Sequence, residues 1–152
     1  MRVLVIEDDP TLRMVLSAAL GILGWATEGV ADAADVAAYD VDVILADLTL
    51  GTALPADTIA RITGAAGGTP VVIHTGTVPT EEFERLLSEQ GIADVIEKPA
   101  SADLIHRRLL AVSRKTRQGH RALGAVEGAL ACLATAAHEA LALSLGPPHG
   151  TG

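Results

Sequence analysis

One short stretch limits what this chain can fold into: an aliphatic run from Val41 to Ala46, broken only by Asp42, that ends in Asp47. A short run rich in β-branched residues favours a strand buried on both faces, which is typical of a parallel sheet. In open α/β sheets, ligands bind beyond the carboxyl ends of such strands. Asp47 therefore stands where a functional group is expected, although a carboxylate after a strand is also common as a turn or cap residue.

Strand-like and helix-like segments alternate along residues 1–114, the pattern of a parallel sheet with right-handed crossovers. The expected strands are residues 3–6, 25–30, 41–46, 70–74 and 94–96, and the expected helices are residues 10–23, 32–39, 57–63, 80–90 and 101–114. We predict an α/β fold with a doubly wound five-stranded parallel sheet, in the flavodoxin-like order 2-1-3-4-5, followed by a C-terminal helical extension.

The composition limits the class of partner. The chain carries 19 acidic residues against 11 Lys and Arg, a formal net charge of -8, which argues against DNA or an anionic membrane as the direct partner. Cys132 is the only cysteine, so no internal disulfide is possible, which suits a reducing compartment. The apolar run before Glu7 is too short for a signal peptide. We therefore expect a cytoplasmic protein.

Polar residues follow four of the predicted strands. They are Glu7-Asp8-Asp9 after the first strand, Asp47 after the third, Thr75 after the fourth and Lys98 after the fifth. In the predicted order the first and third strands are neighbours, so their carboxylates converge and repel each other unless a cation joins them. Hard oxygen ligands at a site open to water suit Mg²⁺.

These groups support transfer of a phosphoryl group to Asp47. A carboxylate can act as a nucleophile, and Mg²⁺ and Lys98 would offset the negative charge of the transferred group. Thr75 supplies a hydroxyl between them. Each residue alone also has an ordinary explanation, as an acidic loop, a cap or a solvated lysine, but their occurrence at successive strand ends is more specific.

Residues 1–114 resemble the receiver domain of two-component response regulators. Val-Ile-Glu7-Asp8-Asp9 matches the acidic cluster of that family, Val-Ile-Leu-Ala-Asp47-Leu its phosphoacceptor, Thr75 its switch hydroxyl and Lys98-Pro99 its lysine with a following proline. The resemblance implies that Asp8, Asp47 and the backbone carbonyl of Thr49 coordinate Mg²⁺, with Glu7 acting through water and Asp9 as a secondary acid. It also implies a cis bond between Lys98 and Pro99.

The resemblance implies a function and a partner. The protein would be a phosphoacceptor with self-catalysed phosphorylation and dephosphorylation rather than a conventional enzyme. A histidine kinase or a phosphotransfer protein would donate the phosphoryl group, and the first helix, apolar on nearly every side, would dock it. We predict a stand-alone response regulator that signals by protein contact; a phosphate sink or relay intermediate without its own output is the alternative.

The sequence departs from the family pattern at three places. Leu50-Gly51-Thr52 stands where Pro-Gly is usual, Gly76 follows Thr75 in place of Ala, and Val95 replaces an aromatic residue. The side chain of a valine cannot rotate between a solvent-exposed and a buried position as that of a tyrosine can. We therefore expect phosphorylation to act through Thr75 and the loop over residues 75–80, where Gly76 gives the backbone freedom.

Two other classes share parts of this pattern. A flavodoxin-like FMN carrier needs a phosphate-binding loop after the first strand, and Glu7-Asp8-Asp9 would repel that phosphate. A phosphatase of the haloacid dehalogenase type uses an Asp-x-Asp motif, whereas this chain has Asp47-Leu48-Thr49. Both fit the sequence less well than a receiver domain does.

Residues 115–152 form a separate segment, for which we predict a polar joint over residues 115–120, a helix to Leu145 and a disordered end. One helical face carries an apolar stripe of Leu123, Val126, Leu130, Leu133, Ala137 and Leu141. It keeps a seven-residue step, as in a coiled coil, through Leu123, Leu130 and Ala137 and through Val126, Leu133 and Ala140. Glu127, His138 and Glu139 leave too short an uncharged run for a membrane span. We favour a homodimer from Leu123 to Leu145; packing on the receiver domain or on a kinase would explain the same stripe.

Overall fold

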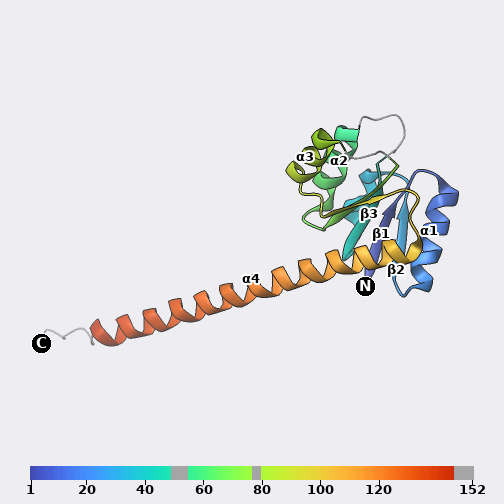
Figure 1. Ribbon diagram of the computed structural model, residues 1–152. Coiled ribbons are helices and arrows are strands. Elements are labelled where there is room, and N and C mark those ends of the chain that lie inside the picture. The colour runs from blue at the N-terminus through green and yellow to red at the C-terminus, as the bar shows by residue number, and fades with distance from the viewer. Residues whose placement is uncertain (49–54, 77–79, 146–152) are drawn as a thin grey trace, which may run out of the picture. The chain divides into compact units, whose positions relative to one another are not determined.

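A computed structural model describes residues 1–48, 55–76 and 80–145, with side chains as far as residue 136 (Figure 1). The chain divides into two compact units, Met1–Arg114 and Lys115–Gly152. The strands are β1 (Arg2–Ile6), β2 (Ala26–Val30), β3 (Val43–Asp47), β4 (Val71–Thr75) and β5 (Asp94–Glu97). The helices are α1 (Pro10–Ile22), the 3-10 helix η1 (Ala33–Ala38), α2 (Pro55–Ala66), α3 (Glu81–Glu89) and α4 (Ala102–Leu145).

The five strands form one parallel sheet in the order β2-β1-β3-β4-β5. This order confirms the predicted doubly wound fold. β3 lies at the centre of the sheet, and all five of its residues are buried. The last residues of neighbouring strands are in register, with Ile6 opposite Ala46 and Asp47 opposite His74. The carboxyl ends of β1, β3 and β4 therefore meet at one edge of the sheet.

Two apolar layers hold the sheet between its helices. One layer joins the sheet to η1, α2 and α3, through residues such as Val36, Ile59 and Leu87. The other joins it to α1 and to the first turns of α4, through Leu20 and Ile105. Figure 1 shows α1 on one side of the sheet and α2 with α3 on the other. Burial of aliphatic side chains on both faces explains why the strands read as nearly continuous apolar runs.

The only tryptophan ties β2 to α4. Trp25 is buried against the layer that holds Leu20 and Ile105. Its indole Nε1–H donates a hydrogen bond of 2.9 Å to Nδ1 of His106 in the second turn of α4. A buried indole needs an acceptor for its N–H, and His106 supplies one, so the start of α4 is fixed against the sheet by a polar contact as well as by packing.

The polar joint predicted over residues 115–120 is wrong, because α4 continues through it without a break. Lys, Arg and Gln favour a helix about as strongly as Leu does, and the stretch contains no proline. The polar residues of this stretch mark the point where α4 becomes exposed, and not the end of the helix. Residues 117–136 of α4 are all exposed. Within the described ranges, no helix is both long and apolar enough to span a lipid bilayer.

Candidate functional site

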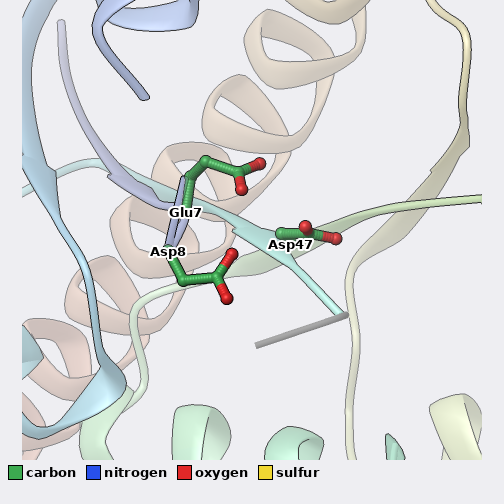
Figure 2. A group of neighbouring side chains, drawn as sticks. All are labelled: Glu7, Asp8 and Asp47. Carbon is green, nitrogen blue, oxygen red and sulfur yellow. The ribbon is translucent and has the colours of Figure 1, made fainter. Parts of the chain in front are cut away.

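Three carboxylates gather at the carboxyl edge of the sheet (Figure 2). Glu7 and Asp8 follow β1, and Asp47 ends β3. One oxygen from each residue can be chosen so that all three lie within 4.8 Å of one another. Glu7 and Asp47 are buried, with exposed fractions of 2% and 5%, whereas Asp8 is exposed. The cluster therefore has a buried side against the sheet and one side open to solvent.

The register of the sheet produces this convergence. Ile6 pairs with Ala46 on the neighbouring parallel strand, so Glu7 and Asp47 are the next residues along two strands that run in the same direction. Side chains at paired positions of neighbouring strands point to the same face of the sheet. The apolar runs of β1 and β3 thus carry two carboxylates to one place, as the sequence predicts.

Lys98 supplies the positive charge of the site. Its Nζ lies 3.1 Å from Oδ2 of Asp47 and 3.5 Å from Oε2 of Glu7. The lysine follows β5, and its backbone N–H donates a hydrogen bond of 2.7 Å to the carbonyl of Thr75 at the end of β4. The peptide bond between Lys98 and Pro99 is cis, as the resemblance implies. The side chain therefore reaches across β4 to Asp47 on β3.

The charged form of Glu7 is disfavoured in this cluster. Burial of the carboxylate raises its pKa above the usual value, and the charge of Asp47 adds to the rise, while Lys98 opposes both. Apart from Nζ of Lys98 at 3.5 Å, its Oε2 has no hydrogen-bond partner among the described residues. A buried carboxylate is costly unless positive charge neutralises it, and Lys98 is shared between Glu7 and Asp47. Together with the oxygen-only ligand set, this fits a hard divalent ion such as Mg²⁺.

His74 is a site residue that the sequence analysis missed. It lies on β4 directly opposite Asp47, and its exposed fraction is 7%. Burial, together with the charge of Lys98, lowers the pKa of its imidazole from 6.5 to about 4, and Asp47 acts in the opposite direction. Its Nε2 has no hydrogen-bond partner within the described part of the chain. The imidazole is therefore neutral at pH 7 and forms part of the buried wall beside Asp47.

The other predicted site residues have different positions. Thr75 is fully buried at the end of β4. The carboxylate of Asp9 caps α1, where it accepts from the backbone N–H groups of Thr11 (2.7 Å) and Leu12 (2.9 Å). The side chain of Asp9 thus stabilises the start of α1 as its N-cap. Thr49, and the Leu50-Gly51-Thr52 stretch after it, lie outside the described residues.

Val95 occupies its predicted place on β5. Its side chain is partly buried and packs against the apolar layer beside α2 and α3. A partly buried aliphatic side chain at this position has no polar tip to place in water, in contrast to a tyrosine. Gly76 directly follows Thr75, and the rest of the predicted switch loop, residues 77–79, is outside the described ranges.

Most of the chain is similar in sequence to known proteins. The family described as the response regulator receiver domain matches residues 3–110. The sensor histidine kinases RcsC of Salmonella typhimurium and of Escherichia coli are each 30% identical to it over 123 residues, which cover 78% of this chain. The match spans only 13% of the length of each kinase.

Solved structures share the fold. The receiver domain of the Francisella response regulator 1452 aligns with a TM-score of 0.65 and 23% identity, over 76% of this chain and 98% of that one. A CheY-like receiver domain protein from Methanospirillum hungatei aligns with a TM-score of 0.65 and 19% identity, over 77% of this chain and 97% of that one. With the acidic cluster at the carboxyl edge of a 2-1-3-4-5 sheet and the family match over residues 3–110, the chain belongs to the response regulator receiver domains of two-component systems.

Proposed function

We propose that Asp47 accepts a phosphoryl group from a phosphohistidine on a histidine kinase or a phosphotransfer protein. The observation that carries this proposal is the cluster of Glu7, Asp8 and Asp47 with the Nζ of Lys98 3.1 Å from Asp47. A carboxylate oxygen of Asp47 attacks phosphorus, the phosphorus–nitrogen bond breaks, and its electron pair returns to the imidazole of the donor. The receiver domain supplies the groups for this step and for the later hydrolysis, so both reactions are self-catalysed.

The charge in the site fits this chemistry. Asp8, Asp47 and the carbonyl of Thr49 would hold Mg²⁺, with Glu7 acting through water. When bound, the ion offsets the negative charge of the phosphoryl oxygens. Lys98, which contacts both Asp47 and Glu7, would bind a phosphoryl oxygen, and the hydroxyl of Thr75 would donate to another. Positioning and charge compensation are the main sources of rate in phosphoryl transfer.

The exposed surface of α1 fits the donor. Leu12, Met14 and Val15 are 48%, 65% and 53% exposed, although a helix that only covers a sheet would carry polar residues there. Asp9 caps α1, so these side chains begin at the acidic loop. A helix of the donor that packs on this apolar surface would bring its phosphohistidine to Asp47.

A phosphate mimic tests the proposal. Beryllofluoride with Mg²⁺ should raise the melting temperature of the protein well above the value with Mg²⁺ alone, because the mimic occupies the place of the phosphoryl group on Asp47. FMN should give no shift, and a chromogenic phosphomonoester should show no steady turnover. Stabilisation by FMN, or continuous hydrolysis, would instead favour a flavodoxin-like carrier or a phosphatase.

Val95 supports a second candidate function, a phosphate sink or relay intermediate without its own output. Without an aromatic residue at this position, the surface near β5 lacks the side chain whose rotation would report phosphorylation. The two functions differ in their partners. An output protein should bind the phosphorylated form selectively, whereas a sink only exchanges phosphoryl groups with kinases or phosphotransfer proteins.

The tail of α4 supports a homodimer of the chain through Leu123 to Leu145. Leu123, Val126, Leu130 and Leu133 are 57–67% exposed and keep the alternating three- and four-residue spacing of a coiled-coil seam. The positions that flank this seam are mostly alanine, so two copies can approach closely without like charges facing each other. A second copy carries the same spacing and is therefore complementary to the seam along its length.

Charge in the seam should separate the subunits. Leu130→Glu combined with Leu133→Glu should convert a dimer to a monomer in light scattering, because paired carboxylates cannot stay in an apolar interface. Ala125→Glu combined with Thr135→Glu adds the same charge away from the seam and should leave the dimer intact. A wild-type chain that is monomeric at high micromolar concentration would contradict the homodimer.

A further inference from the structure

Arg13 in the second turn of α1 reaches back to the acidic loop. Its Nη1 donates a hydrogen bond of 2.6 Å to the backbone carbonyl of Glu7 and a longer one of 3.4 Å to that of Asp8. We propose that Arg13 is a positioning residue for the metal site: it fixes the backbone that presents Glu7 and Asp8, and Gly29 on β2 provides the space that it needs. This inference rests on the proposed function of the cluster as a Mg²⁺ site.

The backbone of the loop needs a partner at this point because the strand ladder ends here. The register pairs of β1 with β2 and with β3 stop at Ile6. One further bond, 3.1 Å from the N–H of Glu7 to the carbonyl of Val30, holds the next residue. The guanidinium then takes the carbonyl of Glu7, so that the peptide groups on both sides of Glu7 are fixed.

Asp8 is the exposed member of the cluster and gains most from a rigid backbone. Before it, the carbonyl of Glu7 is bonded to Arg13. After it, the N–H of Asp9 donates to Oε1 of Glu7 at 3.3 Å, and the carboxylate of Asp9 caps α1. Asp8 therefore sits between two anchored residues. If the guanidinium were lost, the peptide before Asp8 would lose its side-chain partner, and the direction of the carboxylate would be less defined.

Gly29 leaves the space that the side chain of Arg13 occupies. A Cβ at this position would lie 3.0 Å from Cγ and 3.2 Å from Cδ of Arg13, and 3.4 Å from Oγ of Ser17. The two distances to Arg13 are tighter than ordinary carbon–carbon contacts. The stem of Arg13 thus crosses β2 where the strand has no side chain. Because Gly29 does not have a positive φ, the space rather than the backbone conformation requires glycine.

The chemistry of the contact favours arginine over lysine. Both bonds come from one nitrogen, Nη1, which the planar guanidinium holds in a fixed direction, whereas an ammonium is a point charge on a flexible stem. These two bonds go to carbonyl oxygens rather than to the carboxylate oxygens of the cluster. Partners of this kind, which orient metal ligands without touching the metal, typically contribute 10–100-fold to metal affinity.

Four variants test the proposal. Arg13→Met keeps much of the aliphatic side chain over Gly29 and removes the guanidinium. Arg13→Lys keeps the positive charge without the planar guanidinium. Gly29→Ala disturbs the aliphatic part of the Arg13 side chain and keeps the charge. Arg85→Met removes one exposed arginine from α3 and is the charge-matched control. The measurements are amide hydrogen exchange of the Mg²⁺-free protein and the dissociation constant for Mg²⁺ alone.

In Arg13→Met, the amides of Glu7 and Asp9 should exchange faster without Mg²⁺, and the dissociation constant for Mg²⁺ should rise about tenfold. Arg13→Lys and Gly29→Ala should give smaller changes in the same direction, and Arg85→Met should match the wild type. Equal exchange and equal affinity in Arg13→Met and Arg85→Met would overturn the proposal. If Arg13→Met does not fold, unchanged exchange and affinity in Gly29→Ala would overturn it.

The two readouts separate this inference from the function on which it rests. If the wild type does not bind Mg²⁺ at all, the proposed function fails. Exchange in the Mg²⁺-free protein still shows whether Arg13 fixes the loop. If Mg²⁺ binds the wild type normally but Arg13→Met leaves both readouts unchanged, only the role of Arg13 is excluded.

Discussion

Asp8→Ala should remove the stabilisation that Mg²⁺ gives to the wild-type protein. Asp8 is the exposed carboxylate of the cluster, and its oxygen lies within 4.8 Å of oxygens on Glu7 and Asp47. At a Mg²⁺ concentration of 100 times the dissociation constant, a single site raises the free energy of unfolding by about 2.7 kcal/mol. Without Asp8, the ion would lose one of its proposed direct ligands, and the melting temperature should no longer depend on Mg²⁺.

The same substitution should stabilise the Mg²⁺-free protein slightly, because it removes one of three mutually repelling carboxylates. Asp40→Ala is the matched control. Asp40 lies before the amino end of β3 and, within the part of the chain that the structure describes, its carboxylate makes only an exposed ion pair with Arg2. Its loss should therefore leave the response to Mg²⁺ unchanged. An Asp8→Ala protein that melts with the Mg²⁺ dependence of the wild type would place the metal elsewhere.

His74→Val should flatten the pH dependence of stability between about pH 4 and 6.5. In the folded protein, burial holds the pKa of His74 at about 4, against an ordinary value of 6.5. Between these values the unfolded chain binds a proton that the folded protein does not, so this residue makes the protein more stable as the pH rises through this range. A shift of this size corresponds to about 3 kcal/mol.

Glu7 has the opposite sign, because its folded pKa is raised from 4.5. Glu7 makes the protein less stable as the pH rises from 4.5 through the pKa that Glu7 has in the folded protein. Because both proteins contain Glu7, the difference in stability between wild type and His74→Val gives the contribution of the histidine. Urea unfolding at a series of pH values measures this difference, with His120→Ala on the exposed part of α4 as the control. If wild type and His74→Val lost stability in parallel on acidification, His74 would not be buried as a neutral imidazole.

The sheet and its acidic cluster could be predicted because both follow from local pattern. A short aliphatic run between turn residues is a buried strand almost regardless of its surroundings, and parallel strands bring their carboxyl ends together. The sequence alone therefore predicts that Asp47, Glu7 and Asp8 lie in one site. Lys98 followed from the same rule, one strand further along.

Other features depend on tertiary packing and left no clear signal in the sequence. A histidine at the end of a strand is as compatible with solvent as with burial, so the environment of His74 required the positions of Asp47 and Lys98. Arg13 bonds to backbone carbonyls, which any loop offers, and its contact depends on the close passage over Gly29. The continuity of α4 is not evident from the sequence, because residues 115–120 are polar, as a linker would be, although Lys, Arg and Gln also favour a helix.

The most direct test of the proposed function is to locate the phosphoryl group. The protein is incubated with Mg²⁺ and either acetyl phosphate or a phosphorylated kinase domain, and intact mass and peptide mass are then measured. The wild type should gain one phosphoryl group, on the peptide that contains Asp47. Asp47→Asn, which keeps the size of the side chain but lacks the nucleophilic carboxylate, should gain none. Equal labelling of Asp47→Asn at another residue would contradict the assignment of Asp47 as the phosphoacceptor.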